Sequence, residues 1–137
     1  MSTHSYRSAK AIFSGSGSVQ EAGKALAEMG VKKPVIVCDE GIEKAGLTAI
    51  VADVVKGEGL PVEVIANAEP EPRASVINSI VPAIRDGGFD GIIGLGGGSS
   101  LDSAKLLAVL GTADVDPAKP TDVRDFLGTD LVPKPGL

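Results

Sequence analysis

The 137-residue sequence has very little histidine, cysteine or aromatic side chain. His4 and Cys38 are the only residues of their types, and Phe, Tyr and Trp together make up 3% of the chain. One histidine and one cysteine so far apart cannot build a zinc or iron site of the usual kind. A Ser-His-Asp triad would have to recruit His4 from the N-terminal tail. A single cysteine also excludes an internal disulfide, which fits a reducing compartment.

Signals for membranes and for nucleic acids are missing as well. The first ten residues, MSTHSYRSAK, lack the apolar stretch of a secretory signal. No apolar run approaches the roughly 20 residues of a membrane span. The formal net charge of −5 argues against a nucleic-acid binder, which normally presents a basic face. We therefore expect a cytoplasmic protein with a small-molecule substrate and with no membrane or nucleic-acid partner.

Apolar strand-like segments alternate with helical patterns along most of the chain, whose length is that of about one domain. Strands are predicted over 9–13, 34–38, 62–66 and 89–95, helices over about 18–29, 47–57, 73–87 and from the serines at 99–100 onward, and one helical turn near 123–127. This alternation predicts an α/β fold, a Rossmann-like parallel sheet flanked by helices. In such sheets, ligands bind outside the carboxyl ends of the strands.

The stretch GLGGGSSLDSAK, residues 94–105, follows a predicted strand and begins a predicted helix. A helix start leaves about four backbone N–H groups unpaired and carries the positive end of the macrodipole. Glycines at 96–98 would let an anion approach the backbone closely, and the Ser99 hydroxyl would add a donor, so the stretch is typical of a pyrophosphate site. The alternative is a strand-to-helix turn, with Ser99 as N-cap and Asp102 as the acid of a capping box. The two roles can coexist at one helix start.

Asp39 gives independent support for a nucleotide site. The glycine stretch alone departs from the usual G-x-G-x-x-G fingerprint, because Ser99 stands where its last glycine belongs. An acid at the end of the second predicted strand, however, is where a ribose diol is often held by two hydrogen bonds. The same carboxylate would repel a 2′-phosphate, which favours NAD over NADP. The alternative role of Asp39 is that of a turn residue or helix N-cap.

These residues carry a resemblance to a known family. The segment Gly96-Gly97-Gly98-Ser99-Ser100-Leu101-Asp102-Ser103-Ala104-Lys105 matches the GGGSxxDxAK signature of the iron-containing (group III metal-dependent) alcohol dehydrogenases. Further agreement lies in the glycines after Phe13, in a Val-Ile-Val-x-Asp strand at 35–39 and in a proline-bearing link at 70–72. Over nearly its whole length the chain resembles the N-terminal nucleotide-binding domain of this family, which has a dehydroquinate synthase-like fold.

The resemblance implies cofactor-binding roles for six residues. Gly96, Gly97, Gly98 and Ser99 would bind the NAD pyrophosphate, Asp39 would hold the adenosine ribose, and Asp102 would lie toward the nicotinamide. No catalytic or metal-binding residue is implied in this chain. Lys105 belongs to the signature without an assigned role. Cys38 stands where the family usually has Thr or Ser, and Glu71 where it usually has Asn or Asp before the proline.

The resemblance also implies that residues 1–137 form a dinucleotide-binding domain that is incomplete at its C-terminal end. In the family a helical domain follows, whose one aspartate and three histidines bind Fe²⁺ or Zn²⁺. We therefore expect the metal ligands to lie outside this sequence and the fragment alone to be inactive. The full-length protein would transfer a hydride between an alcohol or aldehyde and NAD. Maleylacetate reductase, a polyol dehydrogenase and a non-catalytic nucleotide-binding module remain open alternatives for the function. A homodimer is a further expectation for the assembly.

Overall fold

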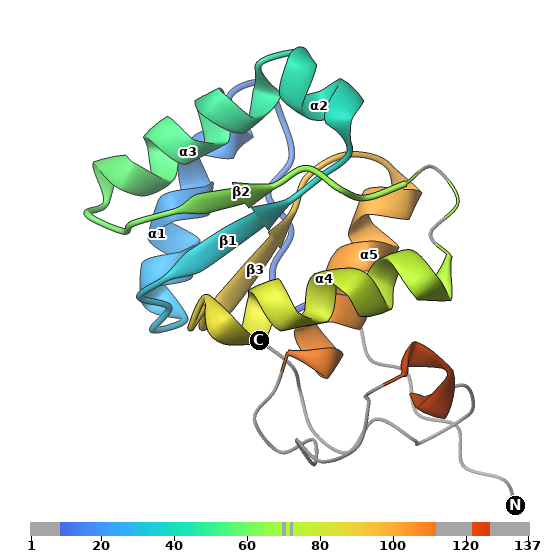
Figure 1. The fold of residues 1–137 in the computed structure, drawn as a ribbon. Helices are drawn as coiled ribbons and strands as arrows, with labels where there is room; N and C mark the ends of the chain where they lie inside the picture. Colours follow the sequence, from blue (N-terminus) through green and yellow to red (C-terminus); the bar gives the residue numbers. More distant parts are fainter. Residues whose placement is uncertain (1–8, 70, 72, 112–121, 127–137) are drawn as a thin grey trace, which may run out of the picture.

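The computed structural model describes residues 9–69, 71, 73–111 and 122–126. They form three layers, with a parallel sheet between two pairs of helices (Figure 1). In chain order the elements are η1 (Ser18–Gln20), α1 (Glu21–Glu28), β1 (Pro34–Val37), α2 (Glu40–Lys44), α3 (Leu47–Gly57), β2 (Glu63–Ile65), α4 (Ala74–Asp86), β3 (Gly91–Gly94), α5 (Gly98–Leu110) and η2 (Val123–Phe126).

The sheet is built around β1, in the strand order β2-β1-β3 with both pairings parallel. Val35 of β1 lies opposite Glu63 of β2 and Ile92 of β3. Every residue of β1 is buried, which is why its sequence is continuously apolar rather than alternating. β2 is an edge strand, and its Glu63 and Val64 are exposed.

Two hydrophobic cores cover the two faces of the sheet. Val35 and Val37 belong to one core and Ile36 to the other, because successive strand side chains point to opposite faces. The first core draws its remaining members mainly from α4 and α5, namely Ile77, Ile80, Val81, Ile84, Ala104, Leu107 and Leu110. The second core comprises Leu26 of α1 with Val51, Ala52 and Val55 of α3. The two helix pairs accordingly lie on opposite sides of the sheet (Figure 1).

The α/β fold predicted from the sequence is confirmed, and α3 has the predicted bounds. The strand predicted over 9–13 is wrong. Ile12 is 80% exposed and Phe13 55% exposed, and among the described residues no strand pairs with this segment. An apolar run becomes a strand only when a neighbour takes up its backbone hydrogen bonds. The five-residue helix α2 was not predicted.

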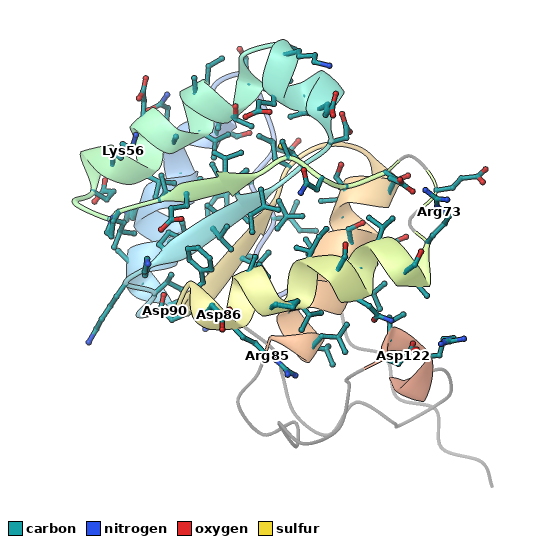
Figure 2. The ribbon with its side chains drawn as sticks, viewed as in Figure 1. Lys56, Arg73, Arg85, Asp86, Asp90 and Asp122 are labelled. Atoms are coloured by element: carbon teal, nitrogen blue, oxygen red, sulfur yellow. The ribbon has the colours of Figure 1, made fainter. Side chains whose placement is uncertain are left out.

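Hydrogen bonds join the amino ends of β1 and β3, at the end of the sheet that lies away from α2 (Figure 2). The Asp90 carboxylate accepts hydrogen bonds from the backbone N–H of Lys32 at 2.9 Å and of Lys33 at 2.6 Å. On the helical side, the Arg85 guanidinium donates to the Leu110 carbonyl at 2.8 Å and so caps the end of α5. These contacts hold the strands and helices whose other ends, at the carboxyl ends of the strands, form the site described below. Within the described ranges, no helix has the length and apolar character needed to cross a membrane.

Candidate nucleotide site

The carboxyl ends of the three strands meet at one edge of the sheet, where the chain leaves toward α2, α4 and α5 (Figure 1). From β1 the chain runs to α2 and α3 on one face, and from β3 it runs to α5 on the other face. This divergence between two neighbouring strands is a topological switch point, where parallel sheets bind their ligands. The predicted site residues lie on these two adjacent connections: Asp39 directly before α2, and residues 96–99 from the loop after β3 into the first turn of α5.

The three glycines after β3 differ in what the fold requires of them. Gly96 has φ +136°, a region that favours glycine, and a Cβ there would lie 2.7 Å from the Ser100 Oγ. Gly97 is the extended N-cap of α5, and Gly98 is the first residue of the helix. A Cβ at either of these two positions would meet no described heavy atom within 4 Å. The described fold therefore needs glycine at 96, whereas glycine at 97 and 98 leaves the backbone open to a ligand.

The start of α5 has the features of an anion site. Its first intrahelical hydrogen bond runs from the Leu101 N–H to the Gly97 carbonyl at 3.1 Å. The N–H groups of residues 98–100 precede this bond and point out of the helix end, where the macrodipole is positive. No acidic residue stands in the first turn to repel a phosphate. The helix start therefore suits a phosphate group.

The alternative in which Ser99 and Asp102 form a capping box is wrong. The helix begins at Gly98, so Ser99 lies in the first turn and Gly97 takes the N-cap position without a side-chain hydrogen bond. Asp102 does not reach back; its Oδ1 accepts a hydrogen bond from the Lys105 Nζ at 3.2 Å, and both side chains are largely exposed. The helix starts earlier because glycine readily adopts the backbone conformations that lead into it.

Asp39 caps α2 and is held by donors from two elements. Its Oδ1 accepts a hydrogen bond from the Ile42 N–H at 2.9 Å, which confirms the N-cap alternative. Its Oδ2 accepts one from the Ser100 hydroxyl at 3.2 Å. The Ile42 bond does most to lower the pKa of Asp39, desolvation acts against it, and the Ser100 bond lowers the pKa further. Asp39 is therefore an ionised acceptor at neutral pH.

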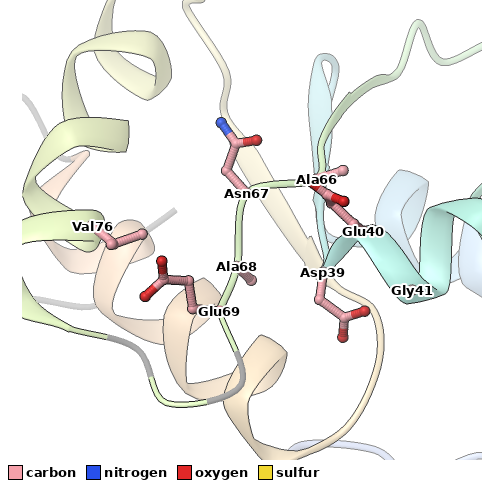
Figure 3. Close-up of a pocket in the computed structure, with 8 residues that line it drawn as sticks. All are labelled: Asp39, Glu40, Gly41, Ala66, Asn67, Ala68, Glu69 and Val76. Atoms are coloured by element: carbon pink, nitrogen blue, oxygen red, sulfur yellow. The ribbon is translucent and has the colours of Figure 1, made fainter.

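A cavity of about 650 Å³ opens beside Asp39, between the loop that follows β1 and the loop that follows β2 (Figure 3). It is lined by Asp39, Glu40, Gly41, Ala66, Asn67, Ala68, Glu69 and Val76. Its charged lining is acidic. Glu40 pairs with Lys44 at 2.6 Å and Glu69 with Arg73 at 2.8 Å, and each hydrogen-bonded pairing lowers the pKa of its carboxylate. The cavity thus combines small apolar side chains with three carboxylates.

The family model for iron-containing alcohol dehydrogenase matches residues 9–136. This chain belongs to that family. The NAD-dependent methanol dehydrogenase of Bacillus methanolicus is 31% identical to it over 121 residues, which are 88% of this chain and 30% of the relative. Long-chain-alcohol dehydrogenase 1 of Geobacillus thermodenitrificans is 36% identical over 123 residues, 90% of this chain and 30% of the relative.

A solved structure of the same kind agrees in fold. The NADH-dependent butanol dehydrogenase A of Thermotoga maritima matches with a TM-score of 0.74 at 26% identity, over 88% of this chain and 29% of that chain. The chain therefore spans about 30% of the length of the iron-containing alcohol dehydrogenases that it matches.

The structure brings together only part of the predicted signature. Asp39 and the glycine loop meet through Ser100, a residue that sequence reasoning did not select. The only signal for Ser100 was its place beside Ser99 in the glycine-serine run. Glu71 is exposed and does not line the cavity, and Lys105 lines a separate cavity of about 250 Å³ between β3 and α5. In the part of the chain that is described, no three His, Cys, Asp or Glu residues are grouped to hold a metal ion.

Proposed function

We propose that this chain supplies the NAD-binding part of an iron-containing alcohol dehydrogenase. One observation carries the proposal: the open start of α5 and the ionised Asp39 carboxylate lie on neighbouring loops at the switch point and are joined by the Ser100 hydrogen bond at 3.2 Å. An anion donor set beside a carboxylate is the combination that a pyrophosphate and its adjoining ribose need. The described residues therefore fit the adenosine diphosphate half of NAD.

The glycine loop would hold the pyrophosphate. Gly97 and Gly98 present backbone without side chains, and the N–H groups of residues 98–100 point out of the helix end. Ser99 in the first turn adds a hydroxyl. Asp102 lies one turn further along α5, and in this proposal it faces the nicotinamide side, because a carboxylate beside the phosphates would be repelled.

The charge around the cavity favours NAD over NADP. Three carboxylates stand on its lining: Glu40 and Glu69 are paired with Lys44 and Arg73, whereas Asp39 accepts hydrogen bonds from neutral donors and keeps its negative charge uncompensated among the described residues. A 2′-phosphate would bring about two further negative charges close to them. A ribose 2′-hydroxyl, in contrast, can donate to Asp39.

For the whole enzyme, we propose an activity as well as cofactor binding. When bound, NAD exchanges a hydride with an alcohol or aldehyde at its nicotinamide. The relatives are named for methanol, long-chain alcohols and butanol, which supports a small alcohol or aldehyde as substrate. The described residues do not fit an iron site, so our proposal assigns them cofactor binding and no turnover of their own.

Titration with NADH and, separately, with NADPH, followed by nicotinamide fluorescence, tests the proposal. We expect NADH to bind about tenfold or more tightly than NADPH. The ribose 2′-hydroxyl of NADH donates a charge-assisted hydrogen bond to Asp39, whereas the 2′-phosphate of NADPH is repelled by the same carboxylate. Asp39→Asn should lower the affinity for NADH and reduce the difference between the affinities for NADH and NADPH. Asp53→Asn removes an exposed carboxylate on α3 and serves as the matched control. Equal affinities, or binding of neither cofactor, would contradict the proposal.

A further inference from the structure

Ser100 joins the two loops of the site. It lies in the first turn of α5 with 1% of its surface exposed, and its Oγ is 3.2 Å from the Asp39 Oδ2. The two residues are 61 positions apart in the sequence, and this hydrogen bond connects the glycine loop after β3 to the loop after β1. A buried hydroxyl that reaches a carboxylate makes a charge-assisted bond, which is stronger than one between neutral groups.

Gly96 leaves the space that this hydroxyl occupies. A Cβ at position 96 would lie 2.7 Å from the Ser100 Oγ and 3.1 Å from the Ser100 Cβ. The positive φ of Gly96 turns the loop at the same point. One glycine of the loop is thus required by Ser100, independently of any bound phosphate.

The second Asp39 oxygen is held from the other side. Oδ1 accepts the Ile42 N–H at 2.9 Å, so the carboxylate plane is defined by a donor on α2 and a donor on α5. A carboxylate offers about four acceptor positions on its two oxygens. Asp39 also lines the cavity, so its carboxylate can accept hydrogen bonds from a ligand there.

We infer that Ser100 is a positioning residue, which orients the Asp39 carboxylate toward the adenosine ribose and sets its distance from the pyrophosphate loop. This inference rests on the proposed function, because it assigns the cavity beside Asp39 to the ribose of NAD. Without the Ser100 hydroxyl, the carboxylate keeps only backbone N–H donors at the start of α2, chiefly that of Ile42, and loses the donor that holds it from α5. A diol that donates two hydrogen bonds is sensitive to this orientation, whereas the pyrophosphate contacts are not.

The chain offers a matched control for this residue. Ser103 lies three positions further along α5 and is 0% exposed, and its Oγ has no hydrogen-bond partner among the described residues. Ser100→Ala and Ser103→Ala each delete one buried hydroxyl from the same helix. Only Ser100→Ala removes a donor to Asp39.

The experiment measures the affinity of each variant for NADH and for the NADH analogue that lacks the 2′-hydroxyl of the adenosine ribose. In the unaltered protein we expect NADH to bind about tenfold more tightly than the analogue, as for a hydrogen bond to a charged group. Ser100→Ala should reduce this ratio about three- to tenfold and leave the affinity for the analogue nearly unchanged. Ser103→Ala should leave both affinities unchanged. Ser100→Cys, with a similar size and a weaker donor, should give an intermediate ratio, and it replaces Ser100→Ala if that variant does not fold.

A double variant separates positioning from direct contact. In an Asp39→Asn background, Ser100→Ala should cause no further loss of NADH affinity, because Ser100 acts through Asp39. Equal ratios in Ser100→Ala and Ser103→Ala, or additive losses in the double variant, would overturn the inference while NADH binding itself stands. Absence of NADH binding in the unaltered protein would instead overturn the proposed function, and the inference with it.

Discussion

At the scale of single residues, Cys38 lies fully buried directly after β1 and directly before Asp39. Burial, and then the nearby carboxylates of Glu43 and Asp39, raise the pKa of its thiol from 9.0 to about 11. Since the thiolate is the reactive form, iodoacetamide should modify Cys38 much more slowly in the folded protein than in urea at about pH 9. The unfolded thiol loses its proton at a lower pH than the folded one, so this group lowers stability as the pH rises from about 9 to 11.

Denaturant titrations at about pH 8 and pH 10, compared with the same titrations of Cys38→Ala, isolate this contribution. The variant should lose less stability between the two pH values than the unaltered protein. Equal losses in both proteins, together with rapid alkylation in the folded state, would show that the thiol ionises freely.

Residues whose role depends on local sequence were predictable, and residues whose role depends on the fold were not. Asp39 stood out because it follows an apolar run, and both its N-cap role and its place at the site edge follow from that position. The hydrogen bond from Ser100 to Asp39 spans 61 positions, and no local pattern reports such a contact. The capping box considered as an alternative for Ser99 and Asp102 has the right spacing, but the preceding glycines let the helix begin two residues earlier.

At the scale of elements, a substitution in the first turn of α5 should change the stability of the protein and its affinity for NADH in opposite directions. Gly98 is helical without a positive φ, and a Cβ there would meet no described atom within 4 Å. Gly98→Ala should therefore raise the free energy of unfolding by about 0.4–1 kcal/mol, because alanine restricts the unfolded chain. The same methyl group would stand between the backbone and a phosphate, so NADH affinity should fall.

Urea denaturation and NADH titration of Gly98→Ala check the two effects on one protein. Gly96→Ala is the contrasting variant: its positive φ and the 2.7 Å approach to Ser100 predict a loss of at least about 1 kcal/mol of stability. If the Gly98→Ala protein is more stable and binds NADH with unchanged affinity, the glycine loop does not bind the phosphate groups.

The elements themselves were predictable where they bury a long apolar face. β1, α3 and α4 carry continuous or periodic apolar residues, and their predicted bounds agree with the structure to within one residue. α2 has five residues, buries no side chain and depends on the Asp39 cap, so it has no periodicity to detect. The segment 9–13 has strand-like composition, but strand formation needs a partner that composition does not reveal.

At the scale of the whole molecule, a ligand that binds only the folded chain must stabilise all of it. The glycine loop and Asp39 together contact the adenosine diphosphate half of NAD in our proposal, so ADP-ribose should stabilise this chain nearly as well as NADH. At a free concentration of 100 times its Kd, either ligand should add about 2.7 kcal/mol, a rise in Tm of roughly 10 °C. Nicotinamide mononucleotide lacks the adenosine ribose and should give little stabilisation.

Measuring the Tm of the protein with each ligand tests this prediction. In the variant Asp39→Asn, the rise in Tm caused by ADP-ribose should be smaller. Stabilisation by nicotinamide mononucleotide but not by ADP-ribose would place the nicotinamide, rather than the adenosine, beside Asp39.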